Sequence, residues 1–272
     1  MAEPIFEELV DKAQPCKCGG IWWNMNPPLK ATPIANSLFI SAAAHLAKRV
    51  PAKKAYYLKW AQGSWDWFFH KRLIRKNWLV ANGMKAANNC FIGGGHHNYY
   101  TYNQGVPIGA LVEIEEATNN SSYIEIALKI ADASLSLLTD SNGILHESGA
   151  TVPGKVDLNL GGDGSTFKGV SARNLARLAR RTGSEKYKDF LSRNADSLWA
   201  NARNMTSGGT FGDNWAGPIN RIVSAAQHQS GLDLLVAAYA VNKPAKAAHT
   251  PQKSTTTKKP TSSSTKKTTA VA

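Results

Sequence analysis

Residues 111–135, LVEIEEATNNSSYIEIALKIADASL, contain the pattern that decides the fold. Apolar side chains recur there at intervals of three and four residues, for example at Leu111 and Ile114 before the polar stretch and at Ile124 and Ala127 after it. That spacing places the apolar side chains on one face of an α-helix. The segment therefore predicts two amphipathic helices joined by a short polar turn.

The same helix–turn–helix pattern occurs twice more, in residues 45–68 and 174–199. In all three segments the second helix begins around a tyrosine, and these tyrosines, Tyr57, Tyr123 and Tyr187, are 66 and 64 residues apart. A repeat of nearly constant length is typical of repeated supersecondary units. The sequence thus predicts a series of helical hairpins.

Eight helices are expected, near residues 4–12, 33–49, 53–70, 104–117, 121–139, 168–182, 185–203 and 219–241. Short turns within the pairs and long loops between them fit either a solenoid or a closed ring, and the loop lengths favour the ring. We therefore predict an all-α fold in which the first helix of each pair faces inward. The N-terminal ends of these inner helices would then meet at one open end.

Amide, hydroxyl and aromatic residues predominate at the starts of the predicted inner helices. They are found among Thr32, Ile34, Asn36, Thr101, Tyr102, Asn103, Gln104, Thr166, Phe167, Lys168, Gln227, His228 and Gln229. Amides and hydroxyls pair with sugar hydroxyls, and flat rings cover the apolar faces of pyranoses, so the set indicates a carbohydrate pocket. The sequence leaves open an alternative, in which Asn103 and Thr166 are N-caps and the aromatic residues belong to the core.

The formal net charge of +13 is largely a property of the C-terminal tail, because residues 243–272 hold seven Lys and no acid and leave +6 for the rest. This Ser/Thr/Lys/Pro-rich tail is expected to be disordered, and residues 1–242 to form the folded domain. No aromatic residues are interleaved with the tail lysines, which argues against nucleic acid as a partner. Neither a membrane span nor a signal peptide is recognisable in the sequence.

Three cysteines, Cys16, Cys18 and Cys90, are too few for a disulfide framework, and no His pair stands beside them at metal-ligand spacing. We therefore expect no metal and no cofactor. A single Cys–Cys bridge remains open.

Four parts of the chain carry a family resemblance: CGGIWWN at 18–24, ATPIANSLFISAAAHLAKR at 31–49, TYNQGVPIGALVEIEEATNNSSYIEIALKIADASL at 101–135 with GILHE at 143–147, and FKGVSARNLARLA at 167–179. They resemble glycoside hydrolase family 76, the endo-α-1,6-mannanases and their fungal cell-wall relatives. The resemblance implies a partial (α/α)6 toroid. It also implies α-mannan or a related cell-wall polysaccharide as the partner, and an extracellular or cell-wall location.

The resemblance further implies a groove for a mannan chain at the heads of the inner helices. Its expected residues are Trp22, Trp23, Tyr102, Asn103, Gln104, Phe167 and Lys168, to which the head of the preceding inner helix adds Asn36. Alternative roles stay open for some of them. Trp22 and Trp23 would fill the core under a Gly turn, and Lys168 would pair with a nearby acid.

The catalytic pair of the family, two adjacent aspartates at the head of an inner helix, has no counterpart, because the sequence contains no Asp-Asp. No catalytic residue is therefore assigned. Retaining glycosidases need two carboxyl groups about 5–5.5 Å apart. Asp66 lies in a predicted outer helix, and no partner at a suitable spacing is found for Glu147, Asp157, Asp163 or Asp213. Of these, Glu147 and Asp163 are the least poor replacements.

Two further departures concern the N-terminal part of the toroid. Asn82 stands where relatives commonly have Asp. Six hairpins of about 65 residues would need well over 300 residues, and only about 242 precede the tail. We therefore expect an N-terminally truncated chain, with roughly 80 more residues encoded upstream of Met1, including a signal peptide and the Asp-Asp helix.

Three functions are compatible with these patterns. The first is a glycosidase or transglycosidase that acts on α-1,6-mannan, with the activity of this chain left open. The second is a non-catalytic carbohydrate-binding or cell-wall structural protein that keeps the groove without the acids. The third, a nucleic-acid-associated helical repeat protein, rests on net charge alone.

Overall fold

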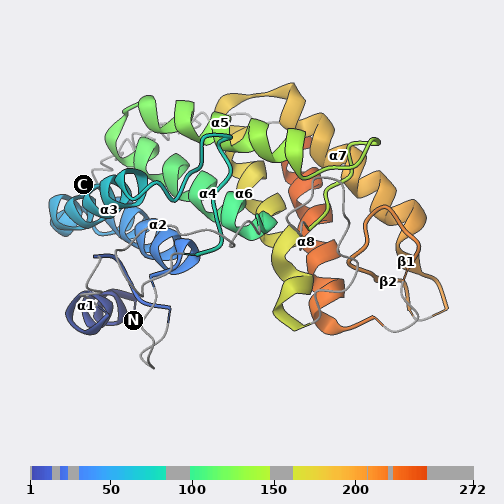
Figure 1. Cartoon of the computed structure of the whole chain (residues 1–272), viewed down its shortest axis with the longest axis horizontal. Coiled ribbons are helices and arrows are strands. Elements are labelled where there is room, and N and C mark those ends of the chain that lie inside the picture. Colours follow the sequence, from blue (N-terminus) through green and yellow to red (C-terminus); the bar gives the residue numbers. More distant parts are fainter. Residues whose placement is uncertain are drawn as a thin grey trace, which may run out of the picture. The chain divides into compact units, whose positions relative to one another are not determined.

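The computed structural model describes residues 2–13, 19–23, 31–83, 99–147, 162–206, 208–219 and 223–243 (Figure 1). Eight α-helices lie in these ranges: α1 (Ala2–Lys12), α2 (Pro33–Arg49), α3 (Lys54–His70), α4 (Thr101–Thr118), α5 (Ser122–Leu137), α6 (Phe167–Thr182), α7 (Glu185–Asn201) and α8 (Ala225–Asn242). The other described elements are the 3-10 helices η1 (Pro51–Lys53) and η2 (Gly162–Thr166) and an antiparallel pair of strands, β1 (Arg203–Asn204) and β2 (Thr210–Phe211). The predicted all-α class is confirmed.

The helices pack as a row of hairpins. α2 contacts α3, α4 contacts α5, and α6 contacts α7, as the sequence repeat predicts. The first helices of the hairpins also contact each other in order, α2 with α4, α4 with α6, and α6 with α8 (Figure 1). These four are the inner helices, and α3, α5 and α7 are the outer ones.

The three repeat tyrosines link each outer helix to the one before it. The Tyr57 hydroxyl of α3 donates to Glu3 of α1 at 2.8 Å, and the Tyr187 hydroxyl of α7 donates to Asp132 of α5 at 2.7 Å. The Tyr123 hydroxyl of α5 accepts a hydrogen bond from Gln62 of α3 at 3.3 Å. The repeat that is visible in the sequence therefore corresponds to a ladder of contacts that joins successive hairpins.

Glycines bring the heads of the inner helices close together. A Cβ atom on Gly105 of α4 would lie 2.5 Å from the Cα atom of Ser171 of α6, and one on Gly169 of α6 would lie 2.8 Å from the Cα atom of Ser230 of α8. Because real Cβ contacts are longer than this, only glycine permits these approaches. The N-terminal ends of α4, α6 and α8 are thus held next to each other.

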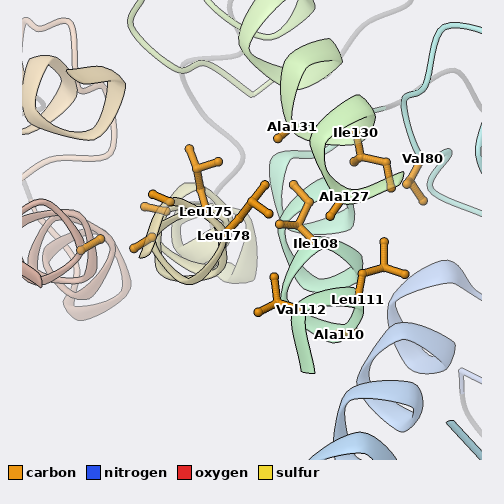
Figure 2. Close-up of a cluster of buried hydrophobic side chains, with 14 of the residues drawn as sticks. Val80, Ile108, Ala110, Leu111, Val112, Ala127, Ile130, Ala131, Leu175 and Leu178 are labelled. Atoms are coloured by element: carbon orange, nitrogen blue, oxygen red, sulfur yellow. The ribbon is translucent and has the colours of Figure 1, made fainter. Parts of the chain in front are cut away.

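The apolar core lies between the inner and outer helices. Figure 2 shows its central part, where Ile108 and Leu111 of α4 and Leu178 of α6 face the side chains of Ala127 and Ile130 of α5. All five side chains are almost fully buried. In the part of the chain that the structure describes, no helix combines the length and apolar character that crossing a membrane would need.

Two helices begin three or more residues away from the predicted positions. α4 begins at Thr101, one turn early, because the Glu147 carboxylate accepts the Thr101 backbone N–H and so caps the helix from a distant loop. α8 begins at Ala225 rather than near 219. Ser224 and Gln227 form reciprocal side-chain to backbone hydrogen bonds at 3.2 and 2.8 Å, the pattern of a capping box.

Candidate functional site

Asn36, at the head of α2, holds the loop that carries the Trp-Trp pair. Its Oδ1 accepts the Ile21 backbone N–H at 2.8 Å, and its Nδ2 donates to the Ile21 carbonyl at 3.1 Å and to the Thr32 carbonyl at 2.8 Å. The side chain is 1% exposed and uses all of its hydrogen-bonding groups on the backbone. We call this three-bond arrangement an amide clamp.

Gln104, at the head of α4, forms the second amide clamp. Its Oε1 accepts the Val80 N–H at 2.7 Å, and its Nε2 donates to the carbonyls of Val80 at 2.9 Å and Tyr100 at 3.0 Å. As with Asn36, one loop residue is held through both of its backbone groups and the third bond goes to the carbonyl four residues earlier. Gln104 thus makes with Val80 the two backbone hydrogen bonds that a neighbouring β-strand would otherwise make.

A third amide clamp comes from an outer helix. Asn194 of α7 accepts the Leu145 N–H at 2.8 Å and donates to the carbonyls of Gly143 at 3.1 Å and Phe190 at 2.9 Å. On α8, His228 Nδ1 likewise accepts a backbone N–H, that of Phe211, at 3.2 Å. Three loops and strand β2 are therefore held by side chains of helices.

Each of these four segments carries a polar or aromatic residue two positions further on. These residues are Trp23, Asn82, Glu147 and Asp213. Three of them contact the heads of inner helices: Asn82 and Glu147 bind α4, and the backbone carbonyl of Asp213 accepts from Lys168 of α6.

An aromatic cluster occupies the junction of α4 and α6. The rings of Tyr102 and Phe167 have centroids 4.0 Å apart, and the ring of Tyr100 lies 5.4 Å from Phe167 and 6.1 Å from Tyr102. The Tyr102 hydroxyl donates to Asn82 Oδ1 at 3.0 Å, and burial raises the pKa of this phenol to about 12. Tyr102 therefore stays neutral and can offer both a ring face and a hydroxyl.

Asn103 lies beside this cluster, and its side chain has one polar atom without a hydrogen-bond partner among the described residues. Its Nδ2 donates to Asn82 Oδ1 at 2.8 Å, whereas its Oδ1 is buried and has no hydrogen-bond partner among the described residues. The side chain is 0% exposed, so this acceptor lacks a solvent contact. Buried acceptors of this kind are uncommon in folded proteins and mark positions where a water or a ligand hydroxyl completes the bonding.

Lys168, the second residue of α6, is a buried cation. Its Nζ donates to the Asp213 carbonyl and lies 4.8 Å from the ring centroid of Trp215. Burial lowers the pKa of this ammonium group to about 8, against the opposing influence of the Glu147 and Asp213 carboxylates. The hydrogen bond of the ammonium group thus goes to a backbone carbonyl, while two acids act on it electrostatically.

The two buried acids of the site are already engaged. Both oxygens of Glu147 accept from Thr101, one from the backbone N–H at 2.9 Å and one from the hydroxyl. Asp213 accepts from the Ser165 hydroxyl at 3.0 Å. A carboxylate held at a helix N-terminus stabilises that helix, so Glu147 has a structural task besides any chemical one.

The two tryptophans of the Gly turn have different surroundings. Gly19 and Gly20 have φ angles of 76° and 82° and pass over the ring of Trp67, where a Cβ on Gly20 would come within 2.5 Å of the ring. Trp22 packs against the core, and Trp23 is 59% exposed. The core role considered for the pair thus matches the packing of Trp22, and Trp23 remains accessible to a ligand.

The other acids considered from the sequence lie outside this cluster. Asp66 is exposed on the outer helix α3, and Asp163 is exposed in η2. Asp157 and the three cysteines fall outside the described residues. Within the described ranges, no group of three or more His, Cys, Asp or Glu side chains could hold a metal ion.

Sequence reasoning missed several members of the site. The groove residues expected from the sequence do not include Tyr100, Asn194 or Trp215, and Asn82 enters there as a departure from the family pattern. Asn194 could not have been found, because it lies on an outer helix and its partner is 49 residues away. Tyr100 could have been found, since it directly precedes the polar head of α4.

Helical hairpins whose adjacent inner helices carry amide, hydroxyl and aromatic residues at one end define an (α/α) toroid protein with a polar site at that end. The chain belongs to glycosyl hydrolase family 76, whose model matches residues 1–252. No curated protein gives a significant match.

Solved structures support the same fold. The Lin0763 protein of Listeria innocua is 27% identical with a TM-score of 0.73, and the match covers 87% of this chain and 63% of that protein. The GH76A α-1,6-mannanase of Salegentibacter sp. HEL1_6 is 23% identical with a TM-score of 0.75, covering 88% and 68%. Dfg5 of Chaetomium thermophilum, solved with glucosamine, is 18% identical with a TM-score of 0.74, covering 88% and 60%.

An inactive variant of the Salegentibacter mannanase, in which two consecutive aspartates are replaced, was solved with α-1,6-mannotriose. That variant is 23% identical to this chain with a TM-score of 0.73 and likewise has 68% of its length covered. The fold of this chain is thus a partial (α/α)6 toroid. It spans about two thirds of the length of these relatives.

Proposed function

We propose that this chain forms the substrate groove of a glycosidase or transglycosidase that acts on α-1,6-mannan. The observation that carries the proposal is the junction of α4 and α6, where the Tyr100–Tyr102–Phe167 cluster stands beside the unsatisfied Oδ1 of Asn103. Aromatic rings cover the apolar face of a pyranose, and an amide oxygen accepts a sugar hydroxyl. Membership of glycosyl hydrolase family 76 and the likeness to an α-1,6-mannanase support mannan as the sugar.

Hydrolysis of the glycosidic bond needs two carboxyl groups that flank the anomeric carbon. The sequence has no Asp-Asp pair, and the two buried acids of the site, Glu147 and Asp213, are engaged by Thr101 and Ser165. We therefore propose that this chain supplies recognition and that cleavage depends on carboxylates beyond those it holds at this site. The extracellular or cell-wall location implied by the family is part of the same proposal.

A second candidate function is carbohydrate binding without catalysis, as in a cell-wall structural protein. The capping of α4 by Glu147 favours it, because a carboxylate that fixes a helix start is poorly suited to leave that position and take up a proton. This candidate keeps the groove and differs only in the absence of turnover.

Calorimetric titration with α-1,6-mannotriose, followed by analysis of the sugar products, tests both candidates. Binding with release of shorter sugars supports the glycosidase, and binding without products supports the binding protein. If α-1,6-mannotriose does not bind the folded protein at millimolar concentration, both candidates fail.

Two variants locate the binding to the proposed groove. We expect Asn103→Leu to weaken binding about tenfold or more, because a sugar hydroxyl loses its acceptor. Asn120→Leu, which changes an exposed amide in the turn after α4, is the matched control and should bind as the parent does. Melting temperatures show whether either variant has lost its fold.

A further inference from the structure

Three inner helices line a hollow near their C-terminal ends. It has a volume of about 400 Å³ and lies where α2, α4 and α6 approach their C-termini. Five of the side chains that line it are cationic: Lys48, Arg49, Arg177, Arg180 and Arg181. Two are carboxylates, Glu113 and Glu116. The lining therefore carries three more positive than negative charges.

Glu113 of α4 organises this hollow. Its side chain is 2% exposed, and its two oxygens bind Lys48 of α2, at 3.0 Å, and Arg177 of α6. Glu113 thus fixes cations from two neighbouring helices, and Glu116 forms a further ion pair with Lys48. Buried ion pairs with fixed geometry hold their charges in place before a ligand arrives.

Two guanidinium groups at the hollow remain available. Arg49 contacts His45 and Arg180 is exposed at the last turn of α6, and neither has a carboxylate within ion-pair distance among the described residues. Arg181 is less available, because it donates two hydrogen bonds to Glu115, at 2.7 and 2.6 Å. Arg49 and Arg180 are therefore the groups that a ligand would reach first.

Cations in the last turn of a helix are common, because the C-terminal end of each helix carries about −0.5 of an elementary charge. The surplus of three charges in the lining falls to two when Glu115, the partner of Arg181, is included, and the ends of α2, α4 and α6 together offset about 1.5 of these. A positive remainder is left in a concave, partly enclosed space. The helix dipoles alone therefore do not account for the cluster.

We propose that this hollow binds an anionic ligand through a phosphate or pyrophosphate group. Guanidinium groups match the oxygens of phosphate with paired N–H donors, and the five cations come from two helices, so they can surround a compact dianion. The site lies at the opposite ends of the inner helices from the mannan groove. It does not depend on the function proposed for that groove.

Calorimetric titration of the full chain with inorganic pyrophosphate in 50 mM salt tests the proposal. We expect a one-to-one complex with a submillimolar Kd that weakens several-fold at 200 mM salt, because surface charges are screened. The double variant Arg49→Ala/Arg180→Ala should weaken binding at least tenfold. Glu116→Gln should strengthen it about threefold, since the variant removes a negative charge from the lining.

The matched control is Lys258→Ala/Lys259→Ala, which removes the same two charges from the C-terminal tail. Unchanged binding in this control supports a site at the hollow. Equal weakening in the two double variants would show that pyrophosphate follows net charge alone, and the proposal would then be wrong. The absence of any saturable binding would also overturn it.

Discussion

The ammonium group of Lys168 lies among aromatic and backbone groups, where burial lowers its pKa from 10.5 to about 8. In the unfolded chain this lysine returns to its ordinary pKa. Between pH 8 and 10.5 the unfolded state therefore binds more protons than the folded state, and the free energy of unfolding rises with pH. Below pH 8 both states are protonated, and the full cost of the buried charge is present.

We predict that Lys168→Met flattens this pH dependence. The parent should gain part of a total of roughly 3 kcal/mol in unfolding free energy between pH 7.5 and 9.5, and the variant should lack that gain. Urea titrations at several pH values measure the slope. Lys59→Met, at an exposed position on α3, should keep the parent's slope. A slope in Lys168→Met equal to the parent's would contradict the assignment of a low pKa to Lys168.

The amide clamps act at the same scale, and Gln104 offers the clearest test of them. Gln104→Met keeps the size of the side chain but leaves the backbone groups of Val80 without partners in a buried place. Since each unsatisfied buried group costs about 1–3 kcal/mol, we expect a loss of about 2–4 kcal/mol in unfolding free energy. Gln229→Met on α8 should change stability by less than about 0.5 kcal/mol. Equal effects of the two changes would refute the clamp.

At the scale of the elements, the inner helices depend on close contact at their heads. α4 and α6 meet at Gly105, and α6 and α8 meet at Gly169. The lost helix propensity of glycine is the cost of this contact, about 1 kcal/mol per residue relative to alanine. The contact aligns Tyr102 of α4 with Phe167 of α6, so the geometry of the aromatic cluster follows from the packing of two helices.

Two glycine-to-alanine changes separate packing from propensity. In Gly105→Ala the new Cβ would lie 2.5 Å from the Ser171 backbone. We therefore expect the unfolding free energy to fall by about 1–3 kcal/mol and α-1,6-mannotriose to bind more weakly. At Gly63 of α3 nothing lies within 4 Å of a new Cβ, and Gly63→Ala should gain about 0.5–1 kcal/mol. Thermal unfolding measures both changes. A stabilised Gly105→Ala would contradict the close approach of α4 and α6.

Most helices and their pairing into hairpins could be predicted from the sequence, because both follow from local periodicity. The capping box Ser224–Gln227 is also visible in the sequence, as a Ser followed three residues later by a Gln. The clamps were not, because Asn36 and Gln104 bind loops 15 and 24 residues away and such bonds leave no periodic trace. The cap of α4 by Glu147, 46 residues distant, was hidden for the same reason.

At the scale of the whole molecule, α8 is apolar on a face that its described neighbours leave exposed. Leu232, Val236 and Tyr239 are 44%, 64% and 65% exposed and follow each other at intervals of four and three residues. A helix that is apolar all round is normally buried. Contiguous exposed apolar surface promotes association.

We therefore predict that the protein self-associates as its concentration rises and that Val236→Glu reduces this behaviour. Light scattering coupled to size-exclusion chromatography over a range of concentrations measures it. Leu137→Glu, at a 41% exposed position at the end of α5, is the matched control and should behave as the parent does. A parent protein that is monomeric at every concentration tested would contradict the prediction.

Hydrolysis of the clamp amides would limit how long the site keeps its structure. Each depends on an amide nitrogen, and slow hydrolysis would convert that nitrogen to a carboxylate oxygen. In Asn36, Gln104 or Asn194 the new carboxylate oxygen would face the two carbonyl oxygens to which the amide nitrogen previously donated. The ageing of three side chains, each detectable as a gain of about one dalton, would therefore release the loops one by one while the helices remained folded.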